Sequence, residues 1–144
     1  MAEDAARGAL ADYLGLKLVP SPILLPGNRR LEIDAFFEDS LQVVLAEIWA
    51  HHGKPRGAQY TKVMQDLLKL VLARDRMLTQ HPGKLIRCYF VYMDAEALAF
   101  VDGRSWKGFA FQHFKVTPLL MKISPDIKNK VMEAQVIQDG WQHE

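Results

Sequence analysis

Two carboxylates stand inside apolar stretches of the sequence. Asp34 lies within the run from Leu31 to Phe37, and Glu47 lies within the run from Gln42 to Ala50. An unpaired charge in such surroundings costs several kcal/mol, so each carboxylate needs a partner, and a bound cation is one way to supply it. Carboxylates on adjacent strands, with waters and a substrate phosphate, can complete the octahedral shell of Mg²⁺. An oxygen-rich site of this kind suits Mg²⁺ or Mn²⁺ better than zinc.

Polar residues on the helix expected after Glu47 could act on a phosphodiester. At about 100° per residue, a stripe roughly 80° wide holds Gln59, Lys62, Asp66 and Lys69. A metal ion activates water and stabilises the charge that develops on a phosphodiester. A lysine from this helix could reach the scissile phosphate. Lys62 is the first choice for that role, and Lys54 in the preceding loop is the second.

The pattern resembles the PD-(D/E)XK nuclease superfamily, which includes many restriction enzymes and repair nucleases. Asp34 matches the first acid of the motif, and Glu47 matches the second. The family pattern has lysine two positions after the second acid, where this chain has Trp49. Some members supply the lysine from the neighbouring helix, and Lys62 looks like such a migrated lysine. Gln59 is similar to a glutamine that helps position the site in a recombination-nuclease branch.

The resemblance covers the layout of roughly residues 2 to 123 and implies a metal-dependent nuclease that hydrolyses DNA. Asp34 and Glu47 would hold Mg²⁺ together with the backbone carbonyl of Ile48 or Trp49. Lys62 would orient or activate the attacking water, and Gln59 would position substrate or lysine. Phosphate contacts that give affinity without sequence specificity would come from Lys54, Arg56 and Lys69. Glu3 or Asp4 could add the further acid that some members carry on the first helix.

Two other interpretations remain open at the level of sequence. The chain could be a catalytically inactive copy of the nuclease fold that acts as a binding or assembly module in a larger complex. It could also be a partner-binding protein of unrelated α/β fold, in which Glu47 pairs with Lys62 or Arg56 in a partly buried salt bridge and no cleft is present. Charges spaced three and four residues apart on a helix often form nothing more than a solvated face.

Periodicity and turn signals predict the elements that must position these residues. A strand is expected where Leu31, Ile33, Ala35 and Phe37 alternate with polar or opposite-facing residues, and it should form a hairpin with the next run. We expect helices over 2–14, 58–78, 94–101, 105–114 and 125–139, and strands over 31–37, 42–50, 85–93 and 116–123, with at most an edge strand over 16–25. This order predicts an α/β or α+β fold, with a central mixed sheet flanked by helices, a restriction-endonuclease-like αβββαβ core and a C-terminal helix.

The length and composition of the chain limit its domain number and its classes of partner. With 144 residues, 49% hydrophobic and 24% charged, the chain fits a single folded domain over residues 1–144. A net charge of +1 gives no bulk signal for nucleic-acid binding, so a DNA-binding face must be local. No signal peptide and no apolar run of about 20 residues is present, which favours a cytoplasmic protein. A homodimer is plausible because one small domain offers limited DNA-binding surface.

Two local features are expected to be structural. The single cysteine, Cys88, excludes an internal disulfide and should be a buried, inert thiol. Aromatic side chains near the C-terminal third, Trp106, Phe109 and Phe111, could stack on nucleobases, although the core is the favoured location.

Overall fold

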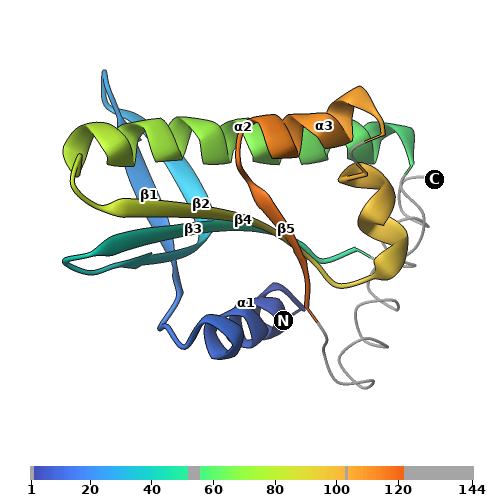
Figure 1. Cartoon of the computed structure of the whole chain (residues 1–144), viewed down its shortest axis with the longest axis horizontal. Helices are drawn as coiled ribbons and strands as arrows, with labels where there is room; N and C mark the ends of the chain where they lie inside the picture. The colour runs from blue at the N-terminus through green and yellow to red at the C-terminus, as the bar shows by residue number, and fades with distance from the viewer. Residues whose placement is uncertain (1, 52–55, 103, 122–144) are drawn as a thin grey trace.

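The computed structural model describes residues 2–51, 56–102 and 104–121, and the helix predicted over 125–139 lies outside them. The elements, in order, are α1 (Ala2–Leu14), β1 (Val19–Leu25), β2 (Arg29–Glu38), β3 (Gln42–Trp49), α2 (Gly57–Gln80), β4 (Leu85–Tyr92), the 3₁₀ helix η1 (Ala95–Phe100), α3 (Trp106–His113) and β5 (Thr117–Leu120). Figure 1 shows three layers, with α1 below the sheet and α2 and α3 above it.

The sheet is mixed, as predicted. Its five strands follow the order β1-β2-β3-β4-β5. The first three form an antiparallel meander, and β3, β4 and β5 run parallel. Parallel neighbours need a crossover connection, and α2 supplies it between β3 and β4. The chain is therefore an α+β protein with a five-stranded mixed sheet flanked by helices. Among the described residues, no helix is both long and apolar enough to cross a bilayer.

Strand β3 is the centre of the core. Every residue from Val43 to Trp49 is buried, as the near-continuous apolar run predicts for a central strand. Alternation along β3 divides these side chains between two hydrophobic clusters. The cluster under α2 contains Val43, Leu45 and Trp49, and the cluster against α1 contains Val44, Ala46 and Ile48. Glu47 shares the odd-numbered face, so its side chain points into the layer between the sheet and α2.

Strand β2 departs from the predicted alternation at Asp34. Val19 of β1 pairs with Phe36, whereas Ser21 pairs with Ile33, so β2 carries one extra residue there, as in a β-bulge. Ile33 consequently packs in the cluster under α2, whereas Ala35 packs in the cluster against α1. The prediction that Ile33 and Ala35 share one face was wrong, because the extra residue reverses the faces on its two sides.

Both edges of the sheet contain proline. The segment predicted to be at most an edge strand forms β1, which includes Pro20 and Pro22, and β5 at the opposite edge includes Pro118. Proline has no N–H to donate, so edge positions tolerate it.

Helix α3 begins as predicted, with the Ser105 hydroxyl accepting a hydrogen bond from the Gly108 N–H at 3.0 Å. A Cβ on Gly108 would lie 1.8 Å from the Asp102 carbonyl oxygen, so this close approach requires glycine. The expected core location was correct for Phe111, which is fully buried, and wrong for Trp106 and Phe109, which are exposed. The reason is geometric: α3 is a surface helix with one buried side, and those two residues lie on its other side.

Candidate functional site

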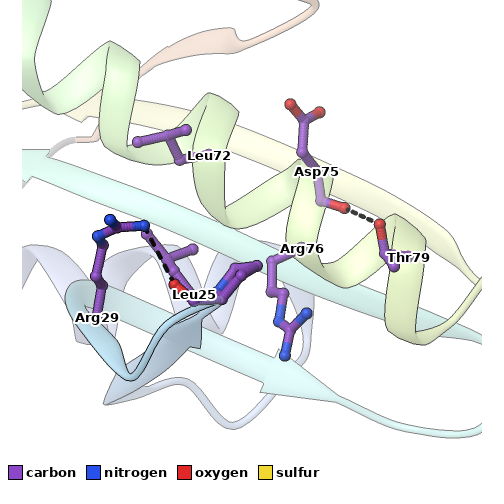
Figure 2. Close-up of a pocket in the computed structure, with 7 residues that line it drawn as sticks. Leu25, Arg29, Leu72, Asp75, Arg76 and Thr79 are labelled. Carbon is purple, nitrogen blue, oxygen red and sulfur yellow. Dashed lines mark hydrogen bonds between the residues drawn. The ribbon is translucent and has the colours of Figure 1, made fainter.

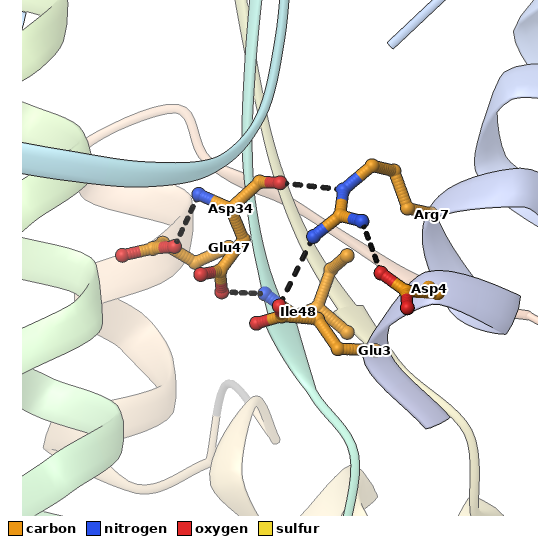
Figure 3. A network of polar contacts seen from close by, with 6 residues as sticks. All are labelled: Glu3, Asp4, Arg7, Asp34, Glu47 and Ile48. Atoms are coloured by element: carbon orange, nitrogen blue, oxygen red, sulfur yellow. Dashed lines mark hydrogen bonds and ion pairs between the residues drawn. The ribbon is translucent and has the colours of Figure 1, made fainter. Parts of the chain in front are cut away.

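The two predicted acids meet where β2 and β3 separate. Backbone pairing between these strands reaches Ala35 and Ala46 and goes no further in that direction. Beyond this point, side chains replace the ladder: the Asp34 N–H donates to Glu47 Oε2 at 3.1 Å, and the Ile48 N–H donates to Asp34 Oδ2 at 2.9 Å (Figure 3). The bulge at Asp34 thus turns its carboxylate toward β3. The two carboxylates form a reciprocal link between the strands.

Helix α2 brings a lysine to the pair. The Lys69 ammonium forms an ion pair with Oε1 of Glu47, whose side chain is 0% exposed. Within the described residues, Oε1 accepts no hydrogen bond beyond this ion pair. The salt bridge considered from sequence therefore exists with a different partner, Lys69, a residue that the sequence assigned to DNA phosphate contacts.

The electrostatics of Glu47 are those of a crowded, buried acid. Burial raises its pKa to about 9, helped by the hydrogen bond and negative charge of Asp34 and opposed by Lys69. Glu47 therefore keeps a proton near neutral pH in the metal-free protein, and the Lys69 ammonium then contacts a neutral acid. Burial pulls the pKa of Lys69 down, but contact with Glu47 and the charges of Asp34 and Asp66 leave it above its ordinary value. Lys69 is a cation across the physiological range.

A third carboxylate, Asp66, belongs to the same electrostatic cluster. Burial raises its pKa to about 6, Lys69 and Lys62 lower it, and Asp34 raises it. Lys62 precedes Lys69 by seven residues on α2, which corresponds to about 10 Å along the helix axis. The positive charge of Lys62 thus acts on Asp66, whereas the contact with Glu47 belongs to Lys69. The catalytic role of Lys62 stays a prediction.

Helix α1 contacts the backbone at Asp34 from the opposite face of the sheet. Arg7 donates to the Asp34 carbonyl oxygen at 2.7 Å, to Asp4 at 2.7 Å and to Glu3 at 3.0 Å (Figure 3). Burial and the neighbouring Asp34 carboxylate raise the pKa of Glu3, which marks Glu3 as the α1 acid near the pair. Sequence reasoning missed Arg7, because an arginine three and four residues after two acids reads as an ordinary surface pair on a helix.

The remaining predicted residues lie near the start of α2. Gln59 Oε1 accepts a hydrogen bond from the Arg56 N–H at 2.9 Å, so this glutamine caps the helix. Arg56 is exposed, as a phosphate contact would require. Lys54 lies outside the described residues. Trp49, which occupies the lysine position of the motif, is 3% exposed and packs in the core under α2.

A hard divalent cation such as Mg²⁺ takes carboxylate oxygens, and Asp34 and Glu47 are the acids at this site. In the described part of the chain, no three His, Cys, Asp or Glu side chains are grouped as a ready-made metal site. Asp34 and Glu47 are nonetheless adjacent, and among the described residues Glu47 Oε1 accepts no hydrogen bond apart from its contact with Lys69. Mg²⁺ characteristically takes one or two carboxylates and completes its shell with water, carbonyl and phosphate oxygens. Asp34 and Glu47 are the carboxylates that such an ion would take, and its charge would replace the proton on Glu47.

A pocket of about 470 Å³ lies elsewhere, between the β1–β2 turn and the second half of α2 (Figure 2). Its lining residues are Leu25, Pro26, Arg29, Leu72, Asp75, Arg76 and Thr79. The two arginines there donate to backbone carbonyls, Arg76 to Leu24 at 2.9 Å and Arg29 to Pro26 at 3.4 Å. None of the predicted site residues lines this pocket.

Comparison with known proteins gave no match: no protein-family model, no curated protein and no solved structure corresponds to this chain.

The raised pKa values predict how the stability of the metal-free protein depends on pH. In the unfolded chain Glu47 loses its proton near pH 4.5, whereas in the folded state it keeps it to about pH 9. The folded state thus binds more protons across this window, and the free energy of unfolding should fall as pH rises from about 5 to 9, by roughly 1 kcal/mol per pH unit. Asp66 should add a smaller fall between its ordinary pKa of 3.8 and about 6.

Urea unfolding in EDTA across this pH range measures the effect. Asp66→Asn should make the slope below about pH 6 smaller, by the contribution of Asp66, and leave the fall above pH 6 unchanged, because Glu47 alone causes that fall. A flat or rising stability between pH 6 and 9 in the wild-type protein contradicts the assignment of a retained proton to Glu47.

Proposed function

We propose that the protein is a metal-dependent nuclease that hydrolyses phosphodiester bonds in DNA. The observation that carries this proposal is the junction between β2 and β3, where Asp34 and Glu47 accept hydrogen bonds across the separating strands and Lys69 contacts Glu47. Two acids and a cationic side chain within one small buried cluster are the groups that metal-assisted phosphodiester hydrolysis requires.

The order of the elements supports the same proposal. A helix, a three-stranded antiparallel meander, a crossover helix and a parallel strand follow one another in the chain, which is the αβββαβ order expected for a restriction-endonuclease-like core. The bulge places Asp34 at the point where the meander opens, and bulges of this kind often re-aim side chains beside active sites. The proposed PD-(D/E)XK relationship rests on this order and on the acids.

Each side chain has a distinct part in the proposed reaction. Asp34 and Glu47, with the Ile48 carbonyl, would hold Mg²⁺ or Mn²⁺. The bound ion would supply an activated water and stabilise the charge on the phosphate. Lys69 would stabilise the same developing charge by its fixed ammonium group. Arg7 would hold Asp34 in place through its backbone carbonyl, and Glu3 would add negative charge on the α1 side.

The migrated lysine is assigned to Lys69 in this proposal, ahead of Lys62. Trp49 fills the core at the motif's lysine position, so the cationic group must come from another element. Lys69 reaches Glu47 from α2. Lys62, which is exposed, and Arg56 are then better suited to contact phosphates flanking the scissile bond.

Incubation of labelled single-stranded, double-stranded and plasmid DNA with the purified protein tests the function. We expect cleavage with Mg²⁺ or Mn²⁺ that stops in EDTA and falls at least about 10²-fold in Asp34→Asn. Glu32→Gln is the matched control, because Glu32 lies on the same strand but is exposed and pairs with Arg30 at 2.7 Å. If the wild-type protein is inert with every metal and substrate, the alternative of a catalytically inactive binding or assembly module takes the place of the nuclease.

A further inference from the structure

One side of α3 presents a row of aromatic rings to solvent. Trp106 is 74% exposed, Phe109 is 54% exposed and Phe114, directly after the helix, is 38% exposed. His113 lies among them, with ring centroids 6.2 Å from Phe109 and 5.0 Å from Phe114. Spacings of three and four residues put Trp106, Phe109 and His113 on one side of the helix, and Phe114 follows directly after His113. We refer to Trp106, Phe109, His113 and Phe114 as the α3 aromatic face.

Such a face needs an explanation, because neighbouring large apolar side chains are seldom left in water unless they bind something. Helix α3 does have a buried side, because Phe111 packs edge-to-face on Phe90 in the core, with 5.2 Å between the ring centroids. The lack of a buried side on α3 therefore does not explain why the other rings are exposed. They are available for contact with a partner.

The charge around the face favours a nucleic acid over a protein. From Arg104 to Lys115 the chain contains three basic residues and no Asp or Glu. Asp102 pairs with Arg104 at 2.7 Å, which leaves Lys107 and Lys115 as the cations of this segment. The Lys107 ammonium lies 5.6 Å from the Trp106 ring centroid. Protein interfaces are depleted in lysine, whereas aromatic rings beside lysines suit bases and phosphates.

The face is also connected to the proposed catalytic helix. Helix α3 lies beside α2 in the same layer (Figure 1). Contacts join the two helices at both ends: the Lys107 ammonium lies 4.9 Å from the Tyr60 ring centroid, and the Arg74 guanidinium donates to the Phe114 carbonyl oxygen. Helix α3 therefore runs alongside the helix that carries Lys62 and Lys69.

We propose that the α3 aromatic face is a stacking platform for unpaired bases, so that the substrate class of the enzyme is single-stranded DNA. In a duplex the bases stack on one another and their faces are unavailable, whereas in a single strand each base can stack on an aromatic ring. Lys107 and Lys115 contact the phosphates of the same strand. The identity of the substrate rests on the proposed nuclease function, but binding to the face is independent of cleavage.

The test is fluorescence anisotropy of a short labelled oligo(dT) with the full chain in EDTA, where no metal-dependent cutting takes place. We expect the dissociation constant to rise at least about tenfold in Trp106→Ala/Phe109→Ala. The matched control is Leu41→Ala/Leu85→Ala, which removes two exposed apolar side chains at the start of β3 and β4 and should leave binding unchanged. An abasic strand of equal length and charge should bind the wild-type protein as weakly as oligo(dT) binds the aromatic double variant.

Each outcome of this experiment either supports or overturns the stacking platform. Equal binding of oligo(dT) and the abasic strand, or unchanged binding in the aromatic double variant, overturns the stacking platform. Loss of a wild-type dimer in that variant, without any oligo(dT) binding, also overturns it and assigns the face to a second copy of the chain. Oligo(dT) binding that depends on the two rings, in a protein that cuts no DNA with Mg²⁺ or Mn²⁺, supports the platform and removes the nuclease function.

Discussion

Lys69→Met is expected to reduce DNA cleavage by about 10²- to 10³-fold, the usual loss when a group that stabilises developing charge is removed. Methionine keeps most of the apolar length of lysine and removes the ammonium that contacts Glu47. Because Glu47 can hold a proton instead of a charge, the fold should survive the substitution. Single-turnover cleavage rates at saturating DNA, measured beside thermal unfolding, separate the loss of chemistry from a loss of structure.

The matched control is Lys62→Met on the same helix. Lys62 is exposed, and its charge acts on Asp66, so its removal should weaken DNA binding and leave the saturated cleavage rate within about tenfold of the wild type. The sequence alone favoured Lys62 as the catalytic lysine. A large loss of rate in Lys62→Met with normal cutting by Lys69→Met would restore that first assignment and reject Lys69.

Glu47→Gln is expected to separate stability from activity. Glutamine imitates the protonated acid in carrying no charge, and its amide oxygen can still accept from the Asp34 N–H. At pH 8 the wild-type chain can fold only if Glu47 takes up a proton, which costs free energy. The substitution removes this cost and should therefore raise the free energy of unfolding of the metal-free protein by a few kcal/mol at pH 8. The same substitution should abolish cleavage, because an amide cannot provide the negative charge that a divalent cation requires.

Urea unfolding in EDTA and cleavage with Mg²⁺ are measured on the same preparation. Asp34→Asn serves as the comparison for Glu47→Gln, since it replaces the other carboxyl group of the pair by an amide. A Glu47→Gln protein that is less stable than the wild type at pH 8 shows that Glu47 is ionised and held by Lys69. One that cuts DNA at the wild-type rate excludes Glu47 from the metal site.

Much of the fold followed from simple periodicity. The continuous apolar run of β3 is typical of a buried central strand, and the spacing of three and four residues between Val63, Leu67 and Leu70 is typical of the buried side of a helix such as α2. Both patterns are long, so a small irregularity does not disturb them. The bulge in β2 had no such signal, because a single extra residue between Ile33 and Ala35 leaves the local pattern of apolar and polar residues looking regular.

The candidate site was predictable as a pair of acids but not as a complete cluster. Asp34 and Glu47 were identifiable because carboxylates are conspicuous in apolar strands. The choice between Lys62 and Lys69 depends on how far α2 is displaced along its axis relative to β3, and the stripe on the helix contains both residues. Arg7 and Glu3 depend on how α1 docks on the opposite face of the sheet, which local sequence does not encode.

The prolines of the outer strands bear on how copies of this chain could assemble. A dimer that extends the sheet would have to pair β1 or β5 with a strand of another copy through backbone N–H and C=O groups. Pro20 and Pro22 remove two donors from one edge, and Pro118 removes one from the edge formed by a strand of only four residues. Sheet extension is thereby discouraged at both edges, which protects the protein from edge-to-edge aggregation. The helices and loops are the surfaces on which a homodimer of this chain would meet less hindrance.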